Sequence, residues 1–290
     1  MEYVIHLIIL INIYIILTTS TNLLVGVTNL LSLGQAALYG IGAYLSVLAL
    51  MVFHWPLIPT LLFSMIITSL LSLLLAWPSL RLKGDYFVLA TLGFQLIVFT
   101  ILYNWVSVTR GPYGIPGIPA PKLLNNIEIS GLWAFFVLSL VLVVVVVFLF
   151  HNLIHSPFGR ALKGIRDDEL SMQALGKNVT ALKIQAFVIS SAFIAISGFL
   201  YATYVSYIDP TSFNLDESFF ILSALIVGGL GNIRGPVIGA LVVILLPEAL
   251  RFIGLPDSVA ANMRQIIYGL ALIVLMRFRP QGIAGNYSIK

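Results

Sequence analysis

Long apolar runs separated by short polar segments set the pattern of this chain. A helix needs roughly 20 apolar residues to cross a bilayer, so each long run predicts a membrane span. Glu2 is the only charge before the first run, whereas a cleavable signal peptide would begin with basic residues, so we expect a retained span that can extend to Val27. Residues 21–53 are less uniformly apolar. In the rest of the chain, the predicted spans cover residues 3–20, 57–77, 86–105, 132–150, 184–207, 218–230, 237–252 and 266–276.

A more polar stretch follows the first span, from residue 21 to 45, and glycines punctuate it at Gly34, Gly40 and Gly42. It predicts a discontinuous second span that lines a polar path, because polar groups in hydrocarbon are costly unless they face protein or water. The alternative is tight helix packing through small residues, and both can hold. The expected path residues, including one from a later span, are Asn22, Asn29, Ser32, Gln35, Tyr39 and Gln95.

The longest polar interruption runs from His151 to Lys183. Ser156, followed by a proline, predicts the N-cap of a helix. Apolar side chains recur on one face of that helix, at Phe158, Ala161, Leu162 and Ile165. Two aspartates can then start a second short helix, ELSMQAL, which Gly176 would end. The pattern predicts a docking surface made of two amphipathic helices, and the alternative is a solvated loop with some helical content.

If the first of these helices docks, its apolar face should insert into a groove on the partner, with its basic residues at the rim. Gly159 costs about 1 kcal/mol relative to alanine inside a helix. We therefore interpret Gly159 as a point of close approach by the partner.

The basic residues predict the orientation in the membrane. Residues 106–131 are rich in glycine and proline and form an exposed loop. If the loops at 81–83, 151–183 and 234 and the tail face the cytoplasm, the outer side keeps only Arg110, Lys122, Arg251 and Arg264. This predicts nine spans with the N-terminus outside. If residues 3–53 cross three times instead of twice, the protein has ten spans with the N-terminus inside, and the sequence leaves both open.

Two short glycine motifs recur at the same spacing. Residues 33–35 (LGQ) precede 41–43 (IGA), and residues 230–232 (LGN) precede 238–240 (IGA). Many transporters consist of two related halves with broken helices near the membrane midplane. The alternative is a chance recurrence of motifs that are common in membrane helices.

The composition agrees with an integral membrane protein. Of the 290 residues, 60% are hydrophobic and 9% are charged, whereas a soluble domain carries roughly 25% charged residues. The mean hydropathy is +1.05. The absence of cysteine excludes disulfides and thiolate chemistry. The net charge of +4 comes from short loops, so it implies no nucleic-acid partner.

The sequence offers no catalytic or metal-binding constellation. Gly176 and Lys177 do not form a Walker A loop, and the four histidines lack metal-ligand spacing. We therefore predict that the chain is not an enzyme and holds no cofactor. Glu248 is the one acid within an apolar run and a candidate for proton coupling. The alternative is a helical ion pair with Arg251, three residues further on.

Four stretches occur in an order typical of one family: LLSLGQAALYGIGAYL, TLGFQLIVFTILYNWVSVTRGPYGIPGIP, GRALKGIRDDELSMQALGKNVTALKIQAFVISSAFIAISGFLYA and VGGLGNIRGPVIGALVVILLPEALRF. They cover most of residues 22–253 and resemble the branched-chain amino acid ABC-transporter permeases of the LivM type. The resemblance implies an all-α integral membrane protein, a polytopic helical bundle of about eight to ten transmembrane helices like the type II ABC importer permeases. Residues 1–290 would form a single permease domain, with a cytoplasmic coupling loop at 151–183 and an external loop at 106–131.

The resemblance also implies partners and a function. The partners would be a homologous LivH-like permease, two cytoplasmic ABC ATPase subunits and an extracytoplasmic substrate-binding protein, in the plasma (inner) membrane of a prokaryote. The implied ATPase contacts are Phe158, Gly159, Arg160, Ala161, Leu162, Ile165, Arg166, Asp167, Asp168 and Glu169.

The implied function is import of branched-chain or other neutral amino acids, with ATP hydrolysis by the separate subunits. Permeases of the same family for urea or amides, and an ion-coupled secondary transporter, remain alternatives. The chain departs from the family in lacking a long N-terminal extension found in some members, and in having Gln35 where histidine is common.

Overall fold

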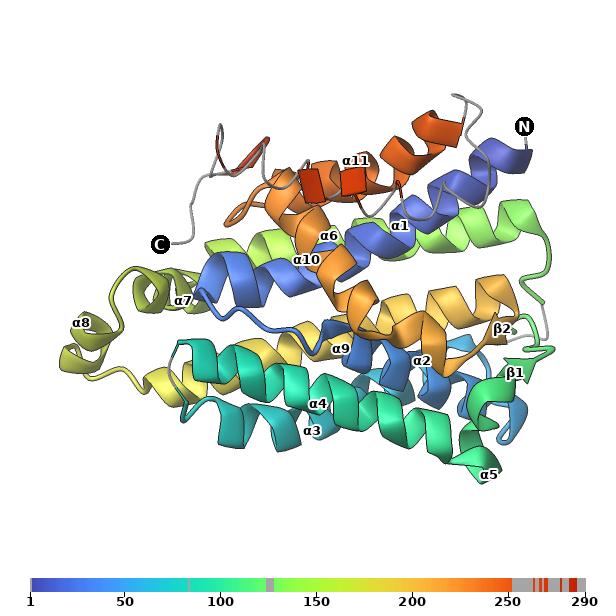
Figure 1. The fold of residues 1–290 in the computed structure, drawn as a ribbon, viewed down its shortest axis with the longest axis horizontal. Helices are drawn as coiled ribbons and strands as arrows, with labels where there is room; N and C mark the ends of the chain where they lie inside the picture. Colours follow the sequence, from blue (N-terminus) through green and yellow to red (C-terminus); the bar gives the residue numbers. More distant parts are fainter. Residues whose placement is uncertain are drawn as a thin grey trace.

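Helices make up nearly all of the structure, as the long apolar runs predict. The computed structural model describes residues 2–82, 84–123 and 128–251, together with 263, 266–267, 269–270, 277 and 282–285. In chain order the elements are α1 (Glu2–Asn22), the π-helix η1 (Leu23–Val27), α2 (Gln35–Met51), α3 (Leu57–Ser79), α4 (Asp85–Asn104), α5 (Val106–Thr109), the 3-10 helix η2 (Gly111–Tyr113), β1 (Ile115–Pro116), α6 (Leu132–His155), α7 (Pro157–Asp167), α8 (Glu169–Ala174), α9 (Val179–Val205), β2 (Tyr207–Ile208), the 3-10 helix η3 (Pro210–Phe213), α10 (Leu215–Gly228) and α11 (Arg234–Arg251) (Figure 1). The predicted all-α fold class is confirmed.

Five helices in the described part of the chain are long and apolar enough to cross a membrane. They are α1 with η1, α3, α4, α6 and α9, while α2 and the first part of α11 are apolar but shorter. The chain is therefore a multi-pass membrane protein. The predicted spans between residues 57 and 252 each coincide with one helix. The predicted span at 266–276 lies mostly outside the described residues, so the total of nine is not tested.

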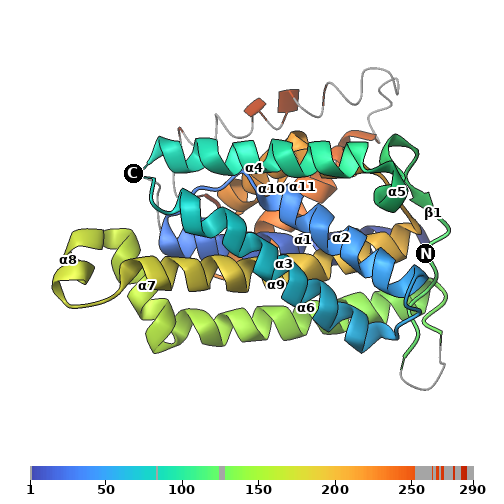
Figure 2. The same ribbon diagram turned by 90° about the horizontal axis from the view of Figure 1, so that it is seen from below.

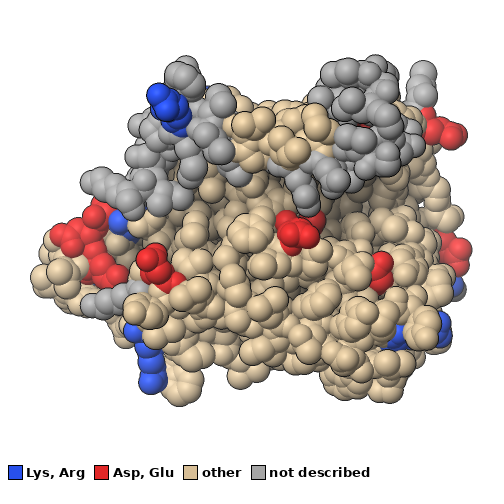
Figure 3. All heavy atoms as spheres, in the orientation of Figure 1, with Lys and Arg blue, Asp and Glu red and all other residues tan. Residues whose placement is uncertain are grey.

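The turns between helices gather at the two ends of the bundle (Figure 1). The N-terminus, α5, β1 and β2 lie at one end, which we call the loop end, and α7 and α8 protrude at the other, the α7–α8 end. Residues 2–51 form two helices rather than three, which agrees with two crossings and not with the ten-span alternative. On the face that Figure 3 shows, lysines and arginines lie toward the two ends, as expected for spans that cross a bilayer.

Helix α9 lies inside the bundle and packs against α1, α2 and α3. Viewed from below, α4 and α6 lie on opposite sides, with α1, α2 and α9 between them (Figure 2). The α2–α9 crossing depends on small residues: a Cβ at Gly42 would lie 2.5 Å from the Ala195 Cα, and one at Gly198 would lie 2.5 Å from the Ala43 backbone nitrogen. Such close approach stabilises helix pairs in membranes. Gly42 therefore serves helix packing.

Candidate functional site

The second span is interrupted, as the sequence predicts. Residues 29–34 run as irregular chain from the α7–α8 end into the bundle, where α2 begins at Gln35 (Figure 1). Most of these residues are buried. Buried backbone N–H groups need partners, because neither water nor lipid can supply them there.

Side chains from α4 and α10 supply these partners. The Leu33 N–H donates to Thr91 Oγ1 at 3.0 Å, and the Ala36 N–H donates to Ser218 Oγ at 3.1 Å. Gln95 makes three contacts: its Oε1 accepts from the Ala37 N–H at 2.5 Å and from the Ser218 hydroxyl at 3.4 Å, and its Nε2 donates to the Phe213 carbonyl at 2.8 Å. Gln95 lies near the middle of α4, so the interruption lies deep within the bundle.

The other predicted path residues do not all lie together in the structure. Three of them lie at or just after the interruption. Ser32 donates to Gln35 Oε1 at 3.2 Å inside the interruption. Tyr39 follows one turn later on α2, with its ring centroid 5.0 Å from that of Phe213. The Gln35 Nε2 and the Tyr39 hydroxyl are buried and have no hydrogen-bond partner in the described part of the chain. Both atoms therefore keep hydrogen-bonding capacity that the described part of the chain does not use.

The two asparagines lie elsewhere. Asn22 joins the end of α1 to the turn before α11: its Nδ2 donates to the Asn232 carbonyl at 2.7 Å, and its Oδ1 accepts from the Gly231 N–H at 3.1 Å. Asn29 is exposed, with φ +58°. Neither shares a described contact with Gln35, Tyr39 or Gln95.

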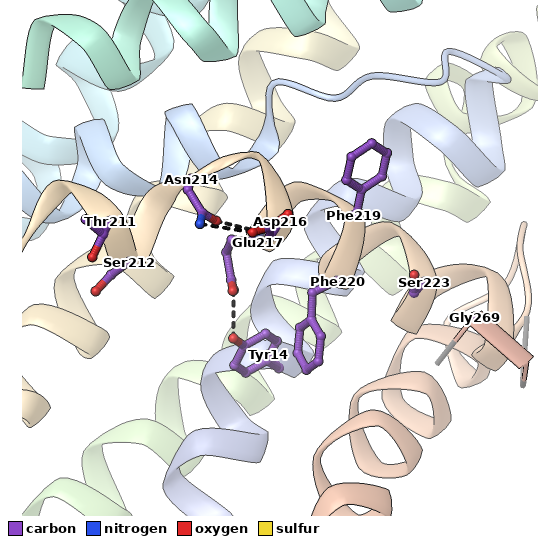
Figure 4. Close-up of a pocket in the computed structure, with 10 residues that line it drawn as sticks. All are labelled: Tyr14, Thr211, Ser212, Asn214, Asp216, Glu217, Phe219, Phe220, Ser223 and Gly269. Atoms are coloured by element: carbon purple, nitrogen blue, oxygen red, sulfur yellow. Dashed lines mark hydrogen bonds between the residues drawn. The ribbon is translucent and has the colours of Figure 1, made fainter. Parts of the chain in front are cut away.

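A cavity of about 660 Å³ contains a carboxylate that sequence reasoning missed. Glu217 points from the first turn of α10 toward α1, where the Tyr14 hydroxyl donates to Glu217 Oε1 at 2.6 Å (Figure 4). No lysine or arginine is among the described residues that line the cavity. The lining residues are Tyr14, Thr211, Ser212, Asn214, Asp216, Glu217, Phe219, Phe220, Ser223 and Gly269.

The position of Glu217 explains why its role is hidden in the sequence. Asn214 is the N-cap of α10 and accepts from the Glu217 N–H at 3.1 Å. An acid three residues after an N-cap suggests a capping box, in which its carboxylate would turn back to the cap. The side chain instead crosses to Tyr14, which lies 203 residues earlier in the chain. The acid that the sequence singles out, Glu248, lies near the end of α11 and has a partner within the chain.

Helices α7 and α8 form the predicted pair at the end of the bundle. Ser156 caps α7 and accepts from the Gly159 N–H at 3.2 Å. Asp168 caps α8 and accepts from the N–H groups of Leu170 and Ser171 at 2.9 and 3.1 Å. The Ser171 hydroxyl also donates to Asp168, and these bonds lower the pKa of the Asp168 carboxyl below its usual value. Asp168 is therefore ionised at neutral pH and holds the start of α8.

The predicted orientation of α7 is wrong. Leu162 and Ile165 are 0% and 4% exposed, because this face packs against α9 and η1 of the same chain. Leu162 and Ile165 are therefore not available to a partner, whereas Phe158 and Ala161 are only partly buried. The explanation given for Gly159 is also wrong: a Cβ there would lie 2.4 Å from the Ile154 carbonyl oxygen, so the glycine permits the sharp α6–α7 turn.

The apolar groups that α8 exposes are different ones. Leu170 and Leu175 are each 74% exposed at the tip of the protrusion. Beside them, Glu169 forms an ion pair of 2.7 Å with Lys183 of α9, which anchors α8 to a long span. The helical periodicity of α7 gave no signal for these two exposed leucines, which lie on α8 and at its C-cap.

One arginine connects this protrusion to the interrupted span. Arg166 of α7 donates to the Gly26 carbonyl of η1 at 3.3 Å and also contacts Asp167 at 2.9 Å. Gly26 precedes the interruption by three residues, and a Cβ there would lie 2.6 Å from the Gly231 nitrogen. A displacement of α7 would therefore reach the start of the interruption directly.

The match to a family model decides the family of this chain. The model for the branched-chain amino acid transport system permease component matches residues 3–276. The chain belongs to this family. It is similar to LivM, a high-affinity branched-chain amino acid transport system permease protein of Escherichia coli, with 33% identity over 93% of this chain and 67% of that protein.

Two more distant relatives are also permeases by name, one for branched-chain amino acids and one for ribose. LivH of Escherichia coli is 26% identical over 65% of this chain and 61% of its own length. The ribose import permease protein RbsC of Haemophilus influenzae is 25% identical over 59% of this chain and 46% of its own length. No solved structure matches this chain. Among the described residues, no cluster of three or more histidines and acids could hold a metal ion.

Proposed function

We propose that the chain is the permease subunit of an ATP-driven importer for branched-chain amino acids in the plasma (inner) membrane of a prokaryote. LivM relatives support the substrate, because 33% identity extends over 93% of the chain. The chain has no Walker A loop, so the energy would have to come from another subunit. The α7–α8 protrusion, which exposes Leu170 and Leu175, supports docking of such a subunit. Separate ATPase subunits would dock there and supply hydrolysis, so this subunit would not itself be an enzyme.

The partner permease would be a LivH-like subunit, since LivH belongs among the relatives. Such a pair would enclose the path between two chains, with residues 1–290 of this chain forming one permease domain. We place Gln35, Tyr39 and Glu217 at the path, because the first two have buried polar atoms without a described partner and the third faces a cavity. A carboxylate suits the ammonium group of an amino acid.

At the loop end, two segments far apart in the sequence would together meet the extracytoplasmic binding protein. Strand β1 pairs antiparallel with β2, with Ile115 opposite Ile208 and Pro116 opposite Tyr207. This pairing joins the external loop at 106–131 to the segment before α10. Tyr113 is 82% exposed on this surface.

Two alternatives have support from particular observations. The ribose permease among the relatives indicates that related chains carry unlike solutes, so urea, amides or other neutral amino acids remain candidate substrates. Glu217 favours the second alternative, an ion-coupled secondary transporter, because such transporters need ionisable groups within the membrane.

Reconstituted vesicles distinguish these possibilities. The chain is purified with the subunits that remain bound and inserted into vesicles that contain ATP or carry a proton or sodium gradient. We expect uptake of radiolabelled leucine that requires ATP, the ATPase subunits and the binding protein. Uptake by the chain alone, driven by a gradient, would contradict the importer. ATP-driven uptake of urea or ribose but not leucine would contradict only the substrate.

A further inference from the structure

A second cavity, of about 490 Å³, lies at the α7–α8 end and is basic. The end of α6 contributes His151 and His155, α7 contributes Lys163, and the start of α11 contributes Arg234. No aspartate or glutamate is among its described lining residues. Ile154, the turn at 231–233, Ala284 and Gly285 complete the wall. Four groups that can be cationic therefore converge where α6, α7 and α11 meet.

These groups are available to a ligand. The described ion pairs involve Lys122, Arg166 and Lys183, and neither Lys163 nor Arg234 takes part in one. The two imidazole rings are 4.4 Å apart, and His155 Nδ1 lies 2.7 Å from the His151 carbonyl oxygen. Because a carbonyl can only accept, His155 Nδ1 carries the proton. Its Nε2 remains for another contact.

An apolar groove of about 450 Å³ continues from this cavity along α6. His151 lines both hollows, and the other groove residues are all apolar: Ile15 of α1, Val143, Val144, Val147 and Phe148 of α6, and Val237 of α11. The groove follows α6 from Val143 to His151, which corresponds to about 12 Å of helix. Val144 and Phe148 are exposed, so the groove opens toward the surroundings of the bundle.

We infer that these two hollows bind one molecule of an anionic phospholipid. Its phosphate occupies the basic cavity, where Lys163 and Arg234 form charge-assisted hydrogen bonds, and an acyl chain lies in the groove. Other ligands fit the two hollows less well. A free phosphate would leave the groove empty. A zwitterionic lipid would bring a positive group close to Lys163 and Arg234, which are both positive. The polar-to-apolar change at His151 matches the change from headgroup to acyl chain.

The lipid would connect elements that carry function. Lys163 belongs to α7, whose neighbour Arg166 contacts Gly26 beside the interrupted span. Arg234 starts α11, and the turn before it is held by Asn22 of α1. A phosphate bound to both cations ties the position of α7 to that turn. The inference concerns a lipid site and stands independently of which solute the protein imports.

Native mass spectrometry of the full chain, with any subunits that remain bound, tests the inference. The probes are phosphatidylglycerol, phosphatidylcholine of the same acyl chains, and inorganic phosphate. We expect binding of phosphatidylglycerol in preference to phosphatidylcholine, and a loss of about fivefold in its affinity for each of Lys163→Gln and Arg234→Gln. Arg81→Gln is the matched control, since Arg81 lies at the same end but stacks 4.7 Å from the Trp77 ring. It should leave the preference unchanged.

The apolar half has its own variants. Val144→Trp fills the groove and should weaken phosphatidylglycerol binding, whereas Val141→Trp, one turn away on the same exposed face, should not. Equal binding of the two lipids, or an unchanged preference after both charge substitutions, would overturn the inference. Competition by inorganic phosphate with no effect of Val144→Trp would show a free-anion site and would also overturn it.

Discussion

At the scale of single residues, the polar side chains of the spans have two different uses. Gln95 and Asn22 satisfy backbone groups that the broken helices leave without helical partners. Gln35 and Tyr39 keep buried polar atoms without a partner among the described residues. A glutamine in an apolar run is compatible with both uses. Only its neighbours show whether it serves the fold or remains available to a solute.

The two glutamines therefore make a matched test. Gln95→Leu leaves the Ala37 N–H and the Phe213 carbonyl unpaired, and each buried unsatisfied group costs about 1–3 kcal/mol. Gln35→Leu removes the hydrogen bond from Ser32 and an amide nitrogen that has no described partner, and it leaves no backbone group unpaired, so it should cost less. Thermal unfolding in detergent should show a lower midpoint for Gln95→Leu than for Gln35→Leu.

Uptake by the same variants separates fold from path. We expect Gln35→Leu to remain folded and assembled but to import less leucine than the unaltered protein. Equal midpoints for the two variants would contradict the structural role of Gln95. Normal uptake by Gln35→Leu would show that Gln35 does not border the path.

At the scale of elements, α7 and α8 differ in whether their apolar side chains are buried or exposed. The amphipathic α7 buries its apolar face in its own bundle, and its Arg166 contacts the start of the interrupted span. The shorter α8 carries the exposed leucines. In the proposed importer, α8 would dock the ATPase subunit and α7 would transmit its movement to the interrupted span. Docking energy at such surfaces comes mainly from a few apolar side chains that become fully buried.

Substitutions on α8 should impair docking, whereas a substitution on the buried face of α7 should impair stability. Leu170→Asp and Leu175→Asp alter exposed positions, so the folded chain should persist while ATPase stimulation and uptake fall. Ile165→Asp places a carboxylate at a buried site, which costs several kcal/mol, so the chain itself should lose stability. Paired measurements of chain yield and ATP-driven uptake distinguish the two outcomes. Coupled transport by the double α8 variant would contradict docking at this site.

A second element-scale feature is the short glycine repeat. In each copy the first motif leads into one of the two shorter apolar helices. Residues 33–35 lead into α2, and residues 230–232 lead into α11. In each case an irregular segment lies directly before the helix. This shared arrangement agrees with two related halves.

At the scale of the whole molecule, the two ends of the bundle differ in construction. The loop end carries the β1–β2 pair and the segment before α10, and the α7–α8 end carries the protrusion and the basic cavity. The distribution of basic residues predicts that the protrusion is cytoplasmic. The two ends should therefore be accessible from opposite sides of the membrane.

Cysteine labelling tests this orientation, because the chain contains no cysteine of its own. Tyr113→Cys should react with a membrane-impermeant maleimide added outside intact cells. Leu175→Cys, also exposed but at the other end, should react only after the cells are opened. The reverse pattern would invert the topology and would exclude docking of cytoplasmic ATPases on α8.

The sequence by itself determined the local features of this protein. Apolar runs long enough to cross a bilayer marked the helices, because spans must satisfy all their backbone hydrogen bonds internally. Ser156 and Gly176 marked the limits of the α7–α8 segment, since caps depend on residues close in the chain. Polar residues and glycines marked the interruption before α2 for the same reason.

The tertiary structure decided which groups meet. Periodicity showed that α7 has an apolar face, but the fold determined that this face meets α9 and not a partner. Glu217 follows its N-cap as a capping acid would, yet its carboxylate contacts Tyr14 from the other end of the sequence. The basic cavity likewise combines Lys163 with Arg234. Contacts between distant residues depend on how whole helices pack. A linear pattern of apolar and polar positions does not specify which helices pack together.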